Sequence, residues 1–526
     1  MAQIKINKNL PIGYSTLENI QADNCLYIDK TQHISTLVNQ GAYYFLSRPR
    51  RFGKSLFIDT LKQAFLANKS LFKGLYLEKH WDWSIQYPVI HIDFGGGVIQ
   101  TLQDLEQKIH AILDAHYQIY DIISQYADVS NRFNYLITKL YQKTQMRIVV
   151  LVDEYDKPIL DNISNTTAAI IIREGLKNLY SVIKANDASL KFVFLTGVSK
   201  FNKVSLFSGL NNLEDISLTA QYADICGYNQ AELDDAFKQH LKGVDREKLK
   251  QWYNGYNFAG ADTQKVYNPF DILLFFKQGQ LYKNYWFETG SPSFLLKLLQ
   301  ASRYYLPQLE NITLTEELLN SFDIERISIE TLLFQTGYLT IKHKIIAPFG
   351  GQLSYQLTYP NQEVRTSLMT RLMDYFIDDQ GVVSNSRSQI EQALLNKDFS
   401  KLHAALSGFF AGIPYQWYVN NNIANYEGFY ATVIYSLFNA IGVVTIPEDS
   451  TNKGRIDLSL DVLSYRILME FKTEKNTNAK TAIAQIKAKA YPEKYIAEAK
   501  PIYLIGVSFD KETRNISSFE WELYLQ

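Results

Sequence analysis

The chain has 526 residues, of which 46% are hydrophobic and 20% charged, as in ordinary globular proteins. This length predicts about three domains, and the apolar content excludes wholesale disorder. The formal net charge is −1, so no global field attracts nucleic acid or an anionic membrane. Two cysteines exclude a disulfide framework and a cysteine-rich zinc site. Without a secretory signal or an apolar run of membrane-spanning length, we expect a soluble, cytoplasmic protein that does not bind membranes.

The first 235 residues alternate short apolar runs with amphipathic stretches. The amphipathic stretches, for example 56–66 and 102–116, have helical spacing. Strands that alternate with helices favour an α/β fold with a doubly wound parallel sheet. We expect strands at 43–46, 88–94, 148–152 and 192–195.

The pattern changes twice further along the chain. Residues 236–400 are mainly helical in pattern, with one strand-like piece at 338–346. Residues 401–526 predict a small α/β domain of their own. In that domain we expect helices at 426–440 and 481–491, and strands at 443–447, 455–463, 465–471 and 501–508.

A phosphate-binding pattern stands between the first predicted strand and its helix. In Arg48-Pro-Arg-Arg-Phe-Gly-Lys-Ser55, the pattern G-x-x-x-x-G-K-[ST] fits from Gly53 onward, with Arg48 at the first glycine position. Gly53 lets the backbone approach a phosphate, and the helix start directs free N–H groups at an anion. Lys54 would reach the β- and γ-phosphates of ATP, and Ser55 would ligate Mg²⁺. The alternative is a basic strand-to-helix turn without a ligand.

Two further cations in this loop, Arg50 and Arg51, exceed what phosphate binding requires. We expect both near the phosphates, where they would report the γ-phosphate to the helical middle region. The alternative is plain neutralisation of phosphate charge.

A second half of a nucleotide site follows at the end of the apolar strand 148–152. Asp153 would hold the Mg²⁺ shell, and Glu154 would polarise the attacking water. Thr196, at the end of another strand, would sense the γ-phosphate. The alternative is a buried strand that ends in solvated acids.

A metal-dependent nuclease site is predicted in the C-terminal part. Asp457 lies on one strand, and Glu470 and Lys472 end the next. Because side chains alternate along a strand, Glu470 and Lys472 project to one face, and a hairpin brings Asp457 beside Glu470. Two carboxylates suit Mg²⁺, with Mn²⁺ as an alternative, and Lys472 would orient water or offset transition-state charge. The alternative is an exposed salt bridge between Glu470 and Lys472.

Neighbouring helices offer three more candidates. Glu427 would supply another carboxylate to the metal, and Gln485 and Tyr491 would contact the metal shell or the DNA backbone. Between residues 453 and 500 ten Lys or Arg oppose six acids, a local balance of +4 that favours phosphate binding.

These motifs resemble a bacterial family that joins an AAA-ATPase-like N-terminal domain to a C-terminal PD-(D/E)XK nuclease domain. Gln485 and Tyr491 stand further apart than the Q-x-x-x-Y spacing of RecB-like nucleases, whereas the arginine at position 48 resembles the family's own form of the loop. The matching pieces lie at 27–31, 45–55, 151–156, 195–199, 207–212, 267–269, 337–338, 454–457, 470–472, 485–486 and 491.

The resemblance implies a P-loop NTPase domain over 1–235, a helical lid or linker over 236–400 and a restriction-endonuclease-like domain over 401–526. It implies ATP and Mg²⁺ as cofactors and nucleic acid, above all DNA, as partner. It leaves open whether the chain forms a homo-oligomer or binds a protein partner. Two hypotheses follow: a nuclease under nucleotide control, or a non-cleaving switch that binds nucleic acid or a protein in response to nucleotide.

Overall fold

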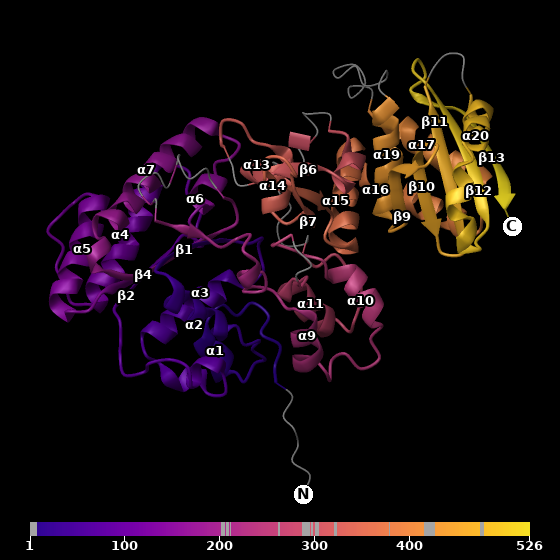
Figure 1. The fold of residues 1–526 in the computed structure, drawn as a ribbon. Coiled ribbons are helices and arrows are strands. Elements are labelled where there is room, and N and C mark those ends of the chain that lie inside the picture. Colours follow the sequence, from indigo (N-terminus) through magenta and orange to yellow (C-terminus); the bar gives the residue numbers. More distant parts are fainter. Residues whose placement is uncertain are drawn as a thin grey trace, which may run out of the picture. The chain divides into compact units, whose positions relative to one another are not determined.

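A computed structural model describes most of the chain (Figure 1). The chain forms two compact units, the first made of Met1–Gly290 and Thr313–Asn361, the second of Ser291–Ile312 and Gln362–Gln526. The three domain ranges drawn from the sequence stay a prediction. The described residues are 8–200, 206, 210, 212–260, 264–286, 295, 298–299, 304–319, 323–377, 379–414, 427–473 and 478–525.

A five-stranded sheet in which every pair is parallel forms the centre of the first unit, in the order β2-β3-β4-β1-β5. β3 is buried along its whole length, as expected for a strand covered on both faces. The predicted α/β fold and its parallel sheet are therefore confirmed. The strands are β1 (Tyr43–Ser47), β2 (Val89–Asp93), β3 (Ile148–Asp153), β4 (Leu190–Gly197) and β5 (Glu214–Asp215).

Amphipathic helices connect these strands, and side-chain caps fix where several of them begin. Thr101 and Asp104 form a capping box at the start of α4, and Asp128 and Asn165 cap α5 and α7. The helices are α1 (Leu17–Ala22), α2 (Thr31–Gln40), α3 (Lys54–Phe65), α4 (Leu102–Ile119), α5 (Val129–Thr144), α6 (Lys157–Leu160) and α7 (Thr166–Ala185), with 3-10 turns η1 (Lys69–Phe72), η2 (Tyr76–Glu78), η3 (Asp187–Ser189) and η4 (Ala220–Tyr222).

The rest of the first unit combines short helices with a second sheet. The helices α9 (Gln230–Ala236), α10 (Arg246–Tyr253) and α11 (Pro269–Lys277) share an aromatic-rich core. The sheet is antiparallel, in the order β6-β8-β7, and only β7 was predicted from the sequence. Its elements are β6 (Thr313–Thr315), α13 (Glu316–Leu319), α14 (Ile329–Gln335), β7 (Thr340–Ile346) and β8 (Leu353–Thr358).

The second unit contains a mixed five-stranded sheet in the order β13-β12-β11-β10-β9. Only the β11–β12 pair is parallel, and the last strand, β13, was not predicted. The strands are β9 (Val444–Thr451), β10 (Gly454–Val462), β11 (Tyr465–Lys472), β12 (Ile502–Asp510) and β13 (Asn515–Leu525); the helices are η6 (Leu306–Glu310), α15 (Gln362–Phe376), α16 (Gln380–Leu395), α17 (Phe399–Gly412), α19 (Glu427–Ala440), α20 (Ala479–Ala488) and η8 (Tyr491–Glu498).

Candidate nucleotide site and candidate nuclease site

The strand order brings the predicted nucleotide-site residues to one edge of the parallel sheet. β4 lies between β1, which leads into the loop 48–55, and β3, which ends at Asp153. The carboxyl ends of parallel strands meet at the same edge, where ligands of such sheets bind. Thr196 Oγ1 donates a hydrogen bond to Asp153 Oδ1 at 2.5 Å, and both side chains are buried.

The loop itself has the backbone of a helix-start anion site. Gly53 has φ 92°, a left-handed conformation that glycine adopts without strain, and α3 begins at Lys54. Lys54 Nζ donates to the carbonyl oxygens of Arg48 at 2.9 Å and Pro49 at 3.0 Å. Burial lowers the pKa of Lys54, and the nearby Asp153 opposes that shift. Ser55, in the first turn of α3, is half-buried.

Arg48 holds the start of the loop rather than facing solvent. Its backbone is not among the left-handed residues, so the arginine in place of glycine meets no strain there. Its guanidinium is buried and donates to the carbonyl oxygens of Ser217 at 2.7 Å and Tyr222 at 2.9 Å. It also lies 4.1 Å from the centre of the Phe258 ring. The sequence did not indicate this structural role, because the partners lie about 170 positions away.

Arg50 and Arg51 are both exposed. The Arg51 guanidinium lies 4.6 Å from the centre of the Phe270 ring, in the first turn of α11. This contact joins the phosphate-binding loop to α11, as the predicted signal from the loop to the helical region requires. That either arginine reads a phosphate stays a prediction.

Glu154 follows β3 in a left-handed conformation with φ 52°. Burial raises its pKa, and the negative charge of Asp153 adds to the shift. Asp93 and Gly95, which the sequence did not assign to the site, lie beside it. A Cβ on Gly95 would be 3.0 Å from Asp93 Oδ1 and 3.4 Å from Glu154 Oε2.

Asp156 anchors the turn that follows β4. Its carboxylate accepts the backbone N–H groups of Val198 at 3.0 Å and Ser199 at 2.5 Å. Gly197 must stay without a side chain, because a Cβ there would be 2.5 Å from Asp156 Oδ1. Burial raises the pKa of Asp156 to about 6, although these hydrogen bonds oppose the shift. Asp156 therefore orders the edge next to Thr196.

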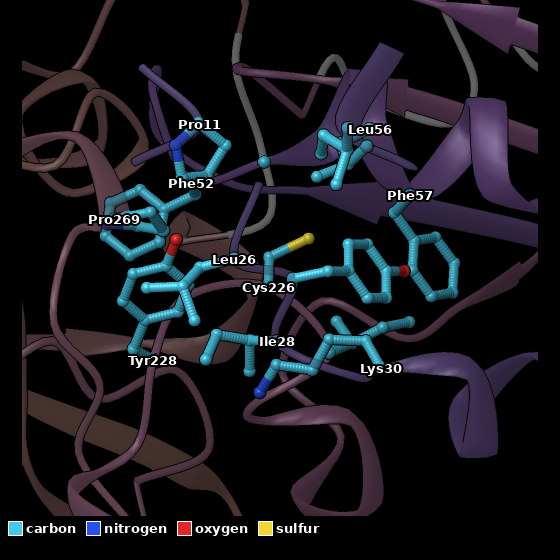
Figure 2. A pocket seen from close by; sticks show the side chains of 15 residues that line it. Pro11, Leu26, Ile28, Lys30, Phe52, Leu56, Phe57, Cys226, Tyr228 and Pro269 are labelled. Carbon is cyan, nitrogen blue, oxygen red and sulfur yellow. The ribbon is translucent and has the colours of Figure 1, made fainter. Parts of the chain in front are cut away.

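A pocket of about 490 Å³, counted to its open mouth, borders the loop (Figure 2). Its walls are mainly apolar. Phe52 and Gly53 of the phosphate-binding loop line the pocket, and so does the charged side chain of Lys30. Lys30 Nζ is held by Glu232 Oε1 at 2.6 Å. The other lining residues are Pro11, Ile20, Leu26, Tyr27, Ile28, Leu56, Phe57, Ile225, Cys226, Gly227, Tyr228 and Pro269.

In the second unit, the β10–β11 hairpin brings the predicted carboxylates together. Leu458 pairs with Met469, and one further step of this register sets Asp457 opposite Glu470. Asp457 Oδ2 accepts the backbone N–H of Phe471 at 2.7 Å. Glu470 Oε1 lies 3.2 Å from Lys472 Nζ. Because the Glu470 side chain is only 2% exposed, this pair is not the exposed salt bridge of the alternative interpretation.

Gln485 contacts this carboxylate pair, and Tyr491 lies near enough to sense its charge. Gln485 Nε2 donates to Glu470 Oε1, and Tyr491 is buried with its pKa raised by burial and by the charges of Glu470 and Asp457. Between them the helix ends and Ala490 adopts φ 48°, a left-handed turn that accommodates the longer spacing. Gln485 is half-buried and Tyr491 is buried, and whether they serve the metal shell or the DNA backbone stays a prediction.

The remaining metal candidate is Glu427, the first residue of α19, whose side chain lies outside the described residues. So do residues 207–209 and 211 of the family resemblance. Within the described ranges, no group of three or more His, Cys, Asp or Glu side chains is placed to hold a metal ion. Two adjacent carboxylates still form the hard oxygen donors that Mg²⁺ and Mn²⁺ accept.

Comparisons with known proteins identify the two domains that carry these candidate sites. The family described as "Predicted AAA-ATPase" matches residues 11–207, and the PD-(D/E)XK nuclease superfamily matches residues 425–519. A protein of Azotobacter chroococcum mcd 1, described as an uncharacterized protein in the vnfD 5′ region, is 47% identical over 513 residues. The match covers 97% of this chain and 98% of that protein.

The chain belongs to this AAA-ATPase-like, PD-(D/E)XK family. Among solved structures, that of the Aeropyrum pernix ORC1 protein in complex with DNA matches with 10% identity and a TM-score of 0.26. That match covers 64% of this chain and 91% of the ORC1 chain. No helix in the described part of the chain is long and apolar enough to cross a bilayer.

Proposed function

We propose that this protein is an ATP-binding, metal-dependent nuclease that acts on DNA under nucleotide control. The observation that carries the proposal is the buried carboxylate of Glu470 beside Asp457, with Lys472 and Gln485 at one of its oxygens. Burying an ionised carboxylate is costly unless a cation or hydrogen-bond donors compensate it. Lys472 compensates one negative charge, whereas Asp457 adds a second carboxylate beside Glu470, and a divalent cation would offset both.

At the nuclease site, Asp457 and Glu470 would hold Mg²⁺ or Mn²⁺, with Glu427 as a further ligand. When bound, such an ion supplies positive charge at a phosphodiester and makes a bound water more acidic. Lys472 would orient the attacking water or offset negative charge in the transition state. Gln485 and Tyr491 would keep the Glu470 carboxylate in position, which is the task of groups around a metal ligand.

At the nucleotide site, the N–H groups at the start of α3 and Lys54 would bind the phosphates of ATP. Ser55 and Asp153 would hold Mg²⁺, and Thr196 would sense the γ-phosphate through its hydrogen bond to Asp153. The raised pKa of Glu154 makes its carboxylate a better proton acceptor, which suits a general base. The apolar pocket beside Gly53 would take the adenine ring.

Nucleotide control would begin at the two loop arginines with partners outside the loop. Arg48 ties the loop to the segment around Ser217 and Tyr222, and Arg51 ties it to Phe270 of α11. A loop that moves when phosphate binds would therefore move both segments. The cytoplasmic location, the preference for DNA and self-assembly are further predictions.

The test is cleavage of linear duplex DNA, single-stranded DNA and RNA in Mg²⁺ or Mn²⁺, each with ATP, ADP or no nucleotide. We expect Asp457→Asn and Glu470→Gln to abolish cleavage while the protein stays folded. Asp461→Asn is the matched control, because Asp461 lies on the same strand but bonds Lys500 Nζ at 2.7 Å. Wild-type cleavage rates in the two carboxylate variants would contradict the nuclease site. Nucleotide-dependent DNA binding without any cleavage by wild type would favour the switch hypothesis.

A further inference from the structure

The outer part of β7 and the turn that follows it are exposed to solvent. Residues 342–346 are all exposed, although successive residues of a strand point to opposite faces of the sheet. Side chains on both faces of β7 are therefore exposed beyond Ile341. β7 is also an edge strand, paired with β8 alone among the described strands.

The end of this hairpin carries apolar side chains in water. Phe349, in the turn, is fully exposed, and Ile346 and Ile345 are 64% and 43% exposed. Single exposed apolar residues are common, but three together on one exposed tip are typical of an interaction site. The described part of the fold leaves these three side chains in water, so a binding partner is the better explanation.

The charge around the tip selects the class of partner. Lys342, His343 and Lys344 are exposed on β7, and residues 331–362 contain no Asp or Glu. Lys342, His343 and Lys344 give this edge of the three-stranded sheet a positive charge that complements phosphate. Apolar side chains inserted between base steps are a recurrent device of minor-groove binders, and Phe349 at the exposed tip has the size and position for such a contact.

We propose that the β7–β8 hairpin is a DNA-binding element, in which Lys342 and Lys344 contact phosphates and Phe349 enters a groove. The inference rests on the proposed function, because it takes DNA as the substrate. It adds a contact in the ATPase-like unit, separate from the candidate nuclease site in the second unit.

The root of the hairpin packs on the phosphate-binding loop. Thr340 Oγ1 accepts the backbone N–H of Asn257 at 2.7 Å and donates to its carbonyl oxygen at 3.0 Å. The neighbours of Asn257, Tyr256 and Phe258, lie edge-on to the Phe52 ring, at 4.8 and 5.6 Å between ring centres.

A second contact joins the same two segments. Gly337, three residues before β7, has φ 91°, and a Cβ there would be 2.7 Å from the Cβ of Pro49. A displacement of the loop would thus reach the hairpin through side chains in direct contact. We therefore expect the hairpin's affinity for DNA to differ between the ATP-bound and ADP-bound protein.

The experiment measures binding of a fluorescent DNA duplex to the full chain by anisotropy, in EDTA so that nothing is cleaved, over a series of salt concentrations. Loss of two phosphate contacts in Lys342→Gln/Lys344→Gln should lower the slope of log affinity against log salt by about 2 and weaken binding roughly tenfold or more. Phe349→Ala should weaken binding with an unchanged slope. The control variants are Lys73→Gln/Lys79→Gln and Ile123→Ala, all exposed in the same unit.

Hairpin variants that bind DNA with wild-type affinity and salt slope would overturn the inference, while continued cleavage by wild type would leave the proposed function intact. A wild-type protein that neither binds nor cleaves any nucleic acid would overturn both. Binding of wild type and the same variants to phosphatidylglycerol vesicles is measured as well. Vesicle binding that depends on Phe349, with DNA binding unchanged in the same variants, would assign the hairpin to a lipid surface instead.

Discussion

The variant Lys54→Met separates the contribution of Lys54 to the stability of the loop from its contribution to ATP affinity. Lys54 is 7% exposed, and its Nζ donates to two carbonyl oxygens, at 2.9 and 3.0 Å. Methionine has a similar length but leaves those carbonyls without this donor, at about 1–3 kcal/mol each. It also removes a buried ammonium, whose desolvation costs several kcal/mol. We expect these terms to offset to within about 2 kcal/mol in the free energy of unfolding without nucleotide.

The effect on ATP should be much larger. Removing one partner of a buried charge pair costs about 2–5 kcal/mol, which weakens binding roughly 30-fold to several thousand-fold. ATP at about 100 times the wild-type Kd stabilises the folded state by about 2.7 kcal/mol. At the same concentration, a variant that binds 100-fold more weakly gains only about 0.4 kcal/mol. Most of the stabilisation by ATP should therefore disappear.

The assay is thermal unfolding of wild type and Lys54→Met, with and without Mg²⁺ and a series of ATP concentrations. Lys62→Met, on the same helix, controls for the loss of a lysine. Equal stabilisation of wild type and Lys54→Met by ATP would refute the assignment of this loop to phosphate. A large drop in the unfolding temperature of the variant without nucleotide would refute the offset between hydrogen bonds and desolvation.

Three further substitutions test the two sites. Glu154→Gln should retain ATP affinity but lose turnover, since the amide cannot accept a proton; undiminished phosphate release would contradict this. Because burial raises the pKa of Asp156 from 3.8 to about 6, between these pH values the folded protein keeps a proton on Asp156 that the unfolded chain has released. As the pH rises from about 4 to 6, the free energy of unfolding of wild type should therefore fall by up to about 3 kcal/mol relative to Asp156→Asn. Denaturation of both proteins at several pH values measures this difference. Gly454 has φ 149°, and a Cβ in Gly454→Ala would lie 2.7 Å from the Tyr491 hydroxyl. The variant should lose about 1–3 kcal/mol of stability and cleave more slowly. A variant as stable and active as wild type would contradict the packing of Tyr491 against Gly454.

The amino-acid sequence determined the local elements and the chemistry at their ends. The short, β-branched run 148–152 favours a buried strand, and a strand that ends in Asp153 and Glu154 presents them at a sheet edge. Period-two geometry alone placed Glu470 and Lys472 on one face of β11. The loop around Gly53 and Lys54 was readable because phosphate binding needs a glycine, a helix start and a cation in that order.

Tertiary structure decided everything that depends on partners far away in the chain. The burial of Arg48 against the carbonyl groups of Ser217 and Tyr222 follows from sheet and loop packing, which no local pattern encodes. The edge strand β13 was not predicted, and the spacing of Gln485 and Tyr491 did not show that Gln485 contacts Glu470 or that Tyr491 lies near the same carboxylates. Their convergence requires the left-handed turn at Ala490 as well as the position of β11. Side-chain periodicity reports which face of an element is apolar, whereas the identity of the element that covers this face is set only when the chain folds.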